Sequence, residues 1–263
     1  MNPLITKIKK KIAICLGVLF WTLASFTAGV EYQRGDVDQD GQVGISDVTC
    51  LIDYLLTGTW GGETPVDNHE YVDLGLPSGT LWATCNVGAI SPEEYGDYFA
   101  WGETSTKEVY NWGSYKWCEG TWNTINKYCI HSQSGTIDGI TELEPEDDAA
   151  YVNWGESWRM PSKEQVKELV DNCSYEWTAI NGVNGELFTA PNGNTLFFPA
   201  ASGCFDDTHG TYGTGGFYWM RSLSTYYSHG AICLYLYSTQ VDENDIYERY
   251  YGFPVRAVRV PQE

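Results

Sequence analysis

The residues with the clearest chemical spacing form an acidic loop near the N-terminus. Counted from Asp36, carboxylates recur at alternate positions, a glycine follows at the sixth position, a backbone carbonyl at the seventh and a further carboxylate at the twelfth. A hard divalent cation prefers several oxygen ligands, and a loop that alternates carboxylates around a glycine turn supplies them. The spacing predicts a calcium site with the ligands Asp36, Asp38, Asp40, Gln42 and Asp47.

An apolar helix face is predicted directly after this loop, because apolar residues recur at steps of three and four before Gly58. Its members are Val48, Leu51, Ile52, Leu55 and Leu56. Loop and helix together, residues 30–58, resemble one repeat of the type I dockerins, which bind cohesin modules in polysaccharide-degrading assemblies and usually carry two repeats. The resemblance implies that Ile45 and Ser46 help to select a cohesin. With one repeat, two interpretations stay open: cohesin docking, or a calcium module that stabilises the chain.

The residues that could act as nucleophiles, acids or bases lack the partner residues that catalysis needs. His131, His209 and His229 have no HExxH or Cys-x-x-Cys companion, so we expect them to be surface residues. Ser202 lies outside any G-x-S-x-G turn, and no spaced set of Ser, His and Asp accompanies it. The acidic run at 142–148 is most simply a solvated loop. The sequence therefore favours a non-catalytic protein.

Structural roles are expected for several charged and sulfur-bearing side chains. In this acidic chain an arginine can form a bidentate ion pair with a carboxylate and so fix the end of a strand to a helix. We expect this role for Arg159, Arg256 and Arg259. Of the eight cysteines, seven follow the apolar N-terminal run, so at least one thiol is free or paired between chains. Cys118 and Cys129 could form a disulfide, and the alternative is that they are small buried hydrophobic residues.

Residues 1–29 are interpreted as a secretory signal. Four lysines between positions 7 and 11 precede an apolar run that extends to about residue 26, and small residues follow it. A retained membrane anchor is the alternative, although the run has about 15 residues where a spanning helix needs roughly 20. We therefore expect an exported protein that resides at the cell surface, in the periplasm or outside the cell.

The exported part of the chain is strongly acidic. The leader carries four of the 15 Lys and Arg residues and none of the 35 Asp and Glu residues, so its removal shifts the net charge from −20 to about −24. Such a surface repels phosphate backbones and anionic lipid headgroups, which argues against nucleic acid as a partner. Because no second apolar run is long enough to span a bilayer, we expect no membrane insertion after the leader is removed.

A series of aromatic and glycine-containing stretches follows a Gly-, Thr- and Pro-rich linker at residues 59–70. In order they are YVDLGLPSGTLWATCNVGA from Tyr71, SPEEYGDYFAWGE from Ser91, WRMPSKEQVKEL from Trp158, NTLFFPAASG from Asn194, GGFYWMRSL from Gly215 and YYGFPVRAVR from Tyr250. Residues 71–263 resemble the Fibrobacter succinogenes major paralogous domain, which is abundant in gut Bacteroidetes. The resemblance implies a C-type-lectin-like fold.

The residues themselves predict an α+β domain with few helices and many short strands. Ser162 and Gln165 form a capping box, and a single apolar face follows, which predicts a helix. That face consists of Val166, Leu169, Val170 and Cys173. Short strands bounded by turn residues are expected at 80–83, 195–198, 217–220, 232–237 and 255–260. Long connections between them, above all 116–148, are typical of a loop-rich scaffold.

Tyr, Ser, Asn and Asp are concentrated in the final third of the chain, a composition typical of recognition surfaces. In the retroelement-diversified relatives of this fold, the region before the terminal GF-x-V-R motif forms the ligand face. The resemblance implies eight candidate contacts: Trp219, Arg221, Tyr226, Tyr227, Tyr235, Tyr237, Asn244 and Tyr247. Because side chains alternate along a strand, the alternative is that half of these tyrosines belong to the core.

The expected function is ligand binding without catalysis. The chain would be an exported, calcium-stabilised protein that recognises a glycan or a protein through its aromatic C-terminal face. One alternative is a component of a polysaccharide-degrading assembly, attached through the dockerin-like repeat, in which the large domain binds or hydrolyses carbohydrate. Another is an adhesive surface protein that contacts neighbouring cells.

Overall fold

The computed structural model describes residues 69–259. The chain divides into two units, Met1–Asp67 and Asn68–Glu263, and the described residues all belong to the second. The boundary falls inside the expected linker at 59–70. The signal segment, the dockerin-like repeat and the five calcium ligands proposed from the sequence lie outside the described residues, so these expectations stay predictions.

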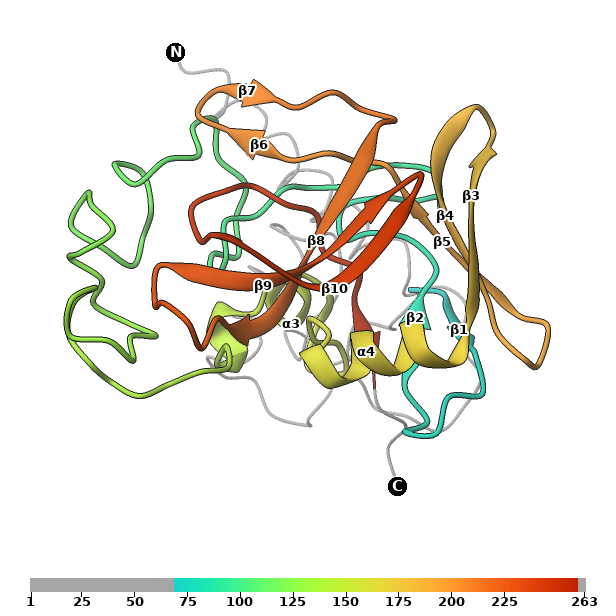
Figure 1. Ribbon diagram of the computed structural model, residues 1–263, viewed down its shortest axis with the longest axis horizontal. Coiled ribbons are helices and arrows are strands. Elements are labelled where there is room, and N and C mark those ends of the chain that lie inside the picture. Colours follow the sequence, from blue (N-terminus) through green and yellow to red (C-terminus); the bar gives the residue numbers. More distant parts are fainter. Residues whose placement is uncertain (1–68, 260–263) are drawn as a thin grey trace, which may run out of the picture. The chain divides into compact units, whose positions relative to one another are not determined.

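Short antiparallel strands dominate the described part of the chain and form four small sheets (Figure 1). One contains β1 (Tyr71–Asp73), β2 (Leu81–Ala83) and β11 (Val258–Arg259). Another contains β3 (Ser174–Ile180), β4 (Val183–Thr189) and β5 (Thr195–Pro199). The largest contains β8 (Gly215–Leu223), β9 (Gly230–Tyr237) and β10 (Gln240–Glu248), and the smallest β6 (Cys204–Phe205) and β7 (Thr208–His209). The fold is therefore mixed and rich in strands, with few helices.

The helix α4 (Lys163–Asn172) begins where the capping box predicts it. The Ser162 hydroxyl accepts a hydrogen bond from the Gln165 amide at 3.3 Å, and the Gln165 side-chain oxygen accepts one from the Ser162 amide at 2.9 Å. These bonds satisfy two amides that a helix N-terminus leaves free. Val166 and Leu169 are buried, so the predicted apolar face is the face that packs.

Both faces of the β10-β9-β8 sheet are covered along much of their length. On one face, Leu234 and Leu236 of β9 pack in a core that also contains Val166 and Leu169 of α4. In Figure 1 the helix lies below β9 and β10 of this sheet. The alternation of apolar residues along β9 therefore places its leucines against the helix and directs the intervening tyrosines to the opposite face.

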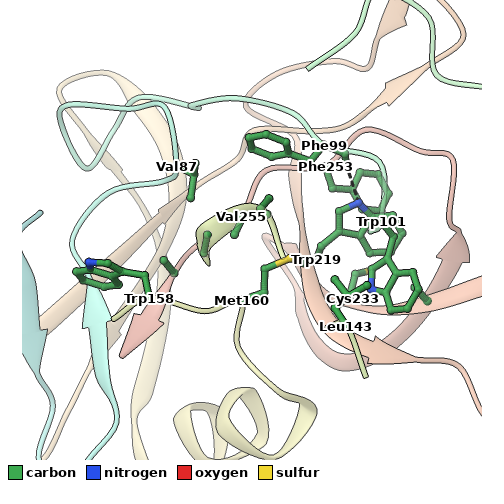
Figure 2. Packing of buried hydrophobic residues seen from close by; sticks show 14 of the residues in the cluster. Val87, Phe99, Trp101, Leu143, Trp158, Met160, Trp219, Cys233, Phe253 and Val255 are labelled. Atoms are coloured by element: carbon green, nitrogen blue, oxygen red, sulfur yellow. Dashed lines mark hydrogen bonds between the residues drawn. The ribbon is translucent and has the colours of Figure 1, made fainter. Parts of the chain in front are cut away.

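A second core covers the opposite face of the sheet (Figure 2). Trp219 of β8 and Cys233 of β9 lie in it with Trp101 and Phe253, and all four side chains are at most 1% exposed. The Trp219 indole donates a hydrogen bond to the Phe99 carbonyl at 2.9 Å. This bond satisfies the one polar atom of the ring, which lets the large side chain be buried at little cost.

The acidic segment at 142–148 is only in part the solvated loop that its composition predicts, because Glu142 and Glu146 are exposed but its last two residues are buried. Asp147 and Asp148 are 2% and 1% exposed, and the segment forms the short 3-10 helix η2 (Pro145–Asp147). Asp148 caps the next helix, α3 (Ala149–Trp154), by accepting two of its first free amides. Burial alone would raise the pKa of Asp147, but hydrogen bonds to its carboxylate lower that pKa. The donors are Lys116, Lys127 and Tyr128.

The fully buried Arg249 holds the long irregular segment that precedes η2. Its Nε donates to the Tyr115 hydroxyl at 2.8 Å, and its Nη atoms donate to three carbonyls at 3.0–3.1 Å. These carbonyls belong to Lys127, Tyr128 and Ser228. The guanidinium also lies 4.8 Å from the Trp101 ring centroid. One side chain near the C-terminus thus supplies the hydrogen bonds that a segment without a strand ladder lacks.

The fully buried Arg256 is structural, but not in the way the sequence suggests. Its Nε donates to the Asn86 side-chain oxygen at 2.9 Å, and its Nη1 donates to the carbonyls of Ala83 and Thr84 at 3.2 and 2.9 Å. The expected fork to a carboxylate is therefore wrong for this residue. Burial lowers the pKa of Arg256 to about 10, which still leaves the side chain charged at neutral pH.

The expected strands fall on or inside β2, β5, β8, β9 and β11, although only Val258–Arg259 of the expected strand at 255–260 pairs as a strand. The composition did not reveal β10, whose residues are mostly polar. Cys118 and Cys129 are both free thiols, as are the other cysteines of the described region. Between residues 69 and 259, no helix is long and apolar enough to cross a membrane.

Candidate ligand-binding surface

A row of seven aromatic side chains runs from the β3-β4-β5 sheet across the β10-β9-β8 sheet to β6. Consecutive ring centroids lie 4.9–6.5 Å apart. We call this row the aromatic strip; in order, its residues are Trp177, Tyr237, Tyr235, Phe217, Tyr247, Tyr251 and Phe205. Tyr237 is 41% exposed and Phe205 45%, while the residues between Tyr237 and Phe205 are half-buried. Two rings of the strip are therefore exposed to solvent, and the others are partly accessible.

Strand register explains why these rings meet. Tyr235 and Tyr237 alternate with Leu234 and Leu236 on β9, so both tyrosines lie on the face opposite α4. Phe217 pairs directly with Tyr235 across the β8–β9 ladder, and their rings stack at 4.9 Å. Paired residues of antiparallel strands share a face, and aromatic pairs there stabilise the sheet.

Trp219 supports the strip from beneath and is not part of it. Its ring is fully buried and lies 4.4 Å from Phe253, which in turn stacks on Phe217 at 5.0 Å. The expectation that Trp219 contacts a ligand is therefore wrong, because the side chain has no surface to offer. It positions the central ring of the strip through Phe253.

Two carboxylates of β10 lie on the same face as the strip. Asp242 pairs with Tyr235 and Asp245 with Cys233 across the ladder, with a bulge between them. Burial raises the pKa of Asp245, and the neighbouring charge of Asp242 raises it further. Neither carboxylate forms an ion pair with a described Lys or Arg. This edge of the strip therefore presents hydrogen-bond acceptors that a ligand with hydroxyl or ammonium donors can use.

The other expected contact residues lie in different places. Tyr226 and Tyr227 are exposed in the turn between β8 and β9, at the end of the sheet opposite Tyr237. Asn244 is exposed in the β10 bulge. Arg221 lines a separate pocket with other arginines. Of the eight candidates, the structure thus brings together Tyr235, Tyr237 and Tyr247 in one surface.

Two of the three histidines differ from expectation. His209 is exposed, as its setting predicts, but His131 and His229 are half-buried. The His229 ring stacks on Tyr227 at 4.4 Å. Burial lowers the pKa of His229, so its ring is mainly neutral at neutral pH. His131 Nδ1 lies 3.3 Å from the Ser228 hydroxyl, so both half-buried histidines are packed side chains of the loop region.

A concavity of about 260 Å³ beside β6 and β7 holds the one sulfur–histidine pair in the described chain. Cys204 Sγ lies 3.0 Å from Nδ1 of His209, which is a distance suited to a nucleophile and its base. The Tyr212 hydroxyl lies 2.7 Å from the same nitrogen. Burial raises the pKa of Cys204 to about 12, so the thiol stays protonated at neutral pH. The pair is a hydrogen-bonded buried thiol and not an activated nucleophile.

Within residues 69–259, no three His, Cys, Asp or Glu side chains are grouped to hold a metal ion. Comparison with known proteins adds no family to this geometry, since no family model, curated protein or solved structure matches the chain. What the fold and the site define is a strand-rich domain with an aromatic, acidic surface.

Sequence reasoning did not find several residues of the strip. Trp177 and Phe205 come from other sheets, and nothing in their local sequence indicates that they meet the tyrosines of β9. Phe217 could have been found, because it precedes the expected contact Trp219 by two positions on a strand and so shares its face. Asp242 and Asp245 were hidden because β10 was not recognised as a strand.

Proposed function

We propose that this chain is an exported, non-catalytic binding protein of a bacterial cell surface that recognises a glycan through the aromatic strip. The observation that carries the proposal is the unbroken row of rings on one face, bordered by two carboxylates without a cationic partner in the described region. The large domain is proposed to have the C-type-lectin-like fold of the major paralogous domain family, on the strength of the motifs it resembles.

The chemistry of the strip supports a glycan. Aromatic rings provide large, rigid apolar area at a low cost in side-chain entropy, which suits the C–H faces of sugar rings. The hydroxyls of Tyr235, Tyr237 and Tyr247 and the carboxylates of Asp242 and Asp245 offer the polar groups that sugar hydroxyls need. A protein ligand would use the same rings, and it is the alternative outcome of the test.

The test is binding of the chain without its leader to an array of uncharged plant and host oligosaccharides. Tyr235→Ala together with Tyr237→Ala should weaken binding about tenfold or more, a loss of about 1.4 kcal/mol for each factor of ten. The matched control is Tyr212→Ala, because Tyr212 is 43% exposed but lies outside the strip. Binding that the control weakens equally, or release of reducing sugar from any glycan, would contradict the proposal.

Calcium is proposed as the cofactor of the N-terminal loop, with Asp36, Asp38, Asp40, Gln42 and Asp47 as the residues that would hold it. Bound to the native state alone, the ion would raise the melting temperature of the module that contains it. Millimolar calcium should raise the melting temperature of the native chain, and Asp36→Ala with Asp40→Ala should remove that increase. An equal increase in the variant would show that the loop is not the site.

The dockerin-like repeat supports a second function, attachment to a polysaccharide-degrading assembly. One module of this type would bind a cohesin-type partner through Ile45 and Ser46, while the large domain binds carbohydrate. A pull-down with isolated cohesin modules tests this directly, with Ile45→Ala and Ser46→Ala as the interface variant. Capture that the variant does not weaken would exclude these positions as the contact.

A further inference from the structure

A pocket of about 200 Å³ is lined by the described arginines that are not buried in the core. The described region contains five arginines, and Arg249 and Arg256 are fully buried. The other three, Arg159, Arg221 and Arg259, all line this pocket, and among the described residues of the lining the one carboxylate is that of Glu156. Three guanidinium groups therefore lie around one pocket, although the chain as a whole has a net charge of −20.

The Arg159 guanidinium is held in place without a carboxylate. It lies 3.9 Å from the centroid of the Tyr151 ring, and its Nη1 donates to the carbonyls of Glu156 and Trp158 at 2.9 and 2.7 Å. Its backbone is fixed as well, since Arg159 and Val258 exchange two amide–carbonyl hydrogen bonds of 2.9 Å. Ring stacking and carbonyl acceptors orient the side chain. Burial raises the pKa of Asp148 and the charge of Arg159 acts to lower it, but Arg159 forms no direct ion pair with a described carboxylate.

Arg221 has one partner and spare donors. Its Nε donates to Glu142 Oε2 at 2.9 Å, and the two side chains are 33% and 47% exposed. An exposed pair of this kind contributes about 0–1 kcal/mol to stability, so it does not explain why three arginines converge. A guanidinium that uses only Nε keeps its Nη donors for a second, planar acceptor.

We propose that this arginine pocket is a binding site for an oxyanion, that is, a carboxylate, sulfate or phosphate group carried by a ligand. Guanidinium groups match the geometry of such anions and bind them through paired N–H donors. The volume is below the range of about 300–1,000 Å³ that whole small-molecule sites occupy, so the pocket takes a single charged group and its nearest atoms. Gln165 and Ser157 add polar side chains to the lining.

The proposal goes beyond glycan binding by the aromatic strip, because that surface carries carboxylates and repels an anion. Arg259 contributes to the lining from β11, where its guanidinium lies 5.1 Å from the Tyr71 ring and 5.5 Å from the Trp158 ring. The argument depends on Arg159 and Arg221, whose environments are described in full.

The experiment titrates the full chain without its leader at low ionic strength with four probes: inorganic phosphate, inorganic sulfate, glucuronate and uncharged glucose. Isothermal titration calorimetry should detect at least one of the three anions and no binding of glucose. Arg159→Gln and Arg221→Gln should each weaken anion binding about tenfold, or about 1.4 kcal/mol, and the double variant should abolish it. Binding of glucuronate alone would identify an acidic sugar as the source, and binding of the inorganic ions would identify a free anion.

Lys167→Gln is the matched control, because Lys167 is an exposed cation of α4 that pairs with Asp171 outside the pocket. It should leave the affinity unchanged. Arg221→Lys keeps the charge but loses the fork, and should bind with an intermediate affinity, which also tests the site if a glutamine variant fails to fold. The proposal is overturned if none of the anions binds, if the control weakens binding as much as Arg221→Gln, or if the double variant binds like the native chain.

Discussion

The aromatic strip and the arginine pocket are built in different ways and carry opposite charge. The strip follows strand register: Phe217, Tyr235 and Tyr237 lie on one face because of alternation and pairing. The pocket instead joins side chains from separate elements, with Arg159 before α4, Arg221 on β8 and Arg259 on β11. The carboxylates of the strip form no ion pair with a described cation, whereas the described lining of the pocket includes three arginines and the carboxylate of Glu156.

This difference shows how an acidic protein can keep two chemistries apart. Charged groups within about 8 Å of each other interact at physiological ionic strength, and beyond that distance salt screens exposed charges. Cations placed beside Asp242 and Asp245 would neutralise the acceptors of the strip. Because the arginines outside the core line one pocket, each surface keeps the charge that its proposed ligand requires.

The sharpest test of the comparison contrasts a buried arginine with a pocket arginine. Arg249→Met keeps the volume but leaves one hydroxyl and three carbonyls without their donor, so the free energy of unfolding should fall by about 3–5 kcal/mol. Arg221→Gln should cost about 1 kcal/mol or less, because it removes only an exposed ion pair. Denaturant unfolding measures both. Equal losses would mean that the pocket arginines are structural, against the proposed anion site.

The strip can be tested by substituting a ring at its centre and a ring near one end. Phe217 contacts three rings, two of the strip and the supporting Phe253, so Phe217→Ala should lower the free energy of unfolding by about 2–4 kcal/mol and weaken glycan binding. Tyr237→Ala removes the second ring of the strip, which is 41% exposed, and should cost about 1 kcal/mol or less, while still weakening binding. If only one of the two variants affects binding, the strip is not a single surface.

A pH test concerns Glu186, which pairs with Trp177 at the end of the strip and is 2% exposed. Burial, and then the charge of Glu176, raises the pKa of Glu186 from 4.5 to about 7. The native state therefore keeps this proton at a pH where the unfolded chain has lost it, and stability falls as the pH rises from about 4.5 to about 7. At about 1.4 kcal/mol per pKa unit, Glu186→Gln should stabilise the protein by up to about 3.5 kcal/mol at pH 8.

The same substitution should have little effect at about pH 3.5, one unit below the ordinary pKa of 4.5, because there the carboxyl group is mostly protonated in both the native and the unfolded state. Glu176→Gln is the control, since Glu176 is exposed and should shift the transition only slightly. Thermal melts across this pH range measure the difference. A pH-independent effect of Glu186→Gln would show that the residue stays ionised and adds a further negative charge to the strip.

The sequence by itself determined the features that depend on neighbouring residues. The capping box fixed the start of α4, and the alternation of leucine and tyrosine on β9 fixed which side chains share a face, because both are consequences of local backbone geometry. It also indicated a strand-rich domain with few helices. Composition did not predict the burial of Asp147 in the segment at 142–148, because the lysines that bind its carboxylate lie 20 and 31 positions away in the sequence.

Only the tertiary structure decided which surfaces exist. Trp219 looks like any other aromatic residue of a recognition face, and its burial follows from the packing of Phe99, Trp101 and Phe253 around it. The strand β10 is polar and has weak strand propensity, but pairing with β9 along its length forms it. The arginine pocket joins residues up to 100 positions apart, and no local pattern reports such contacts because their energy is realised only when the chain has folded.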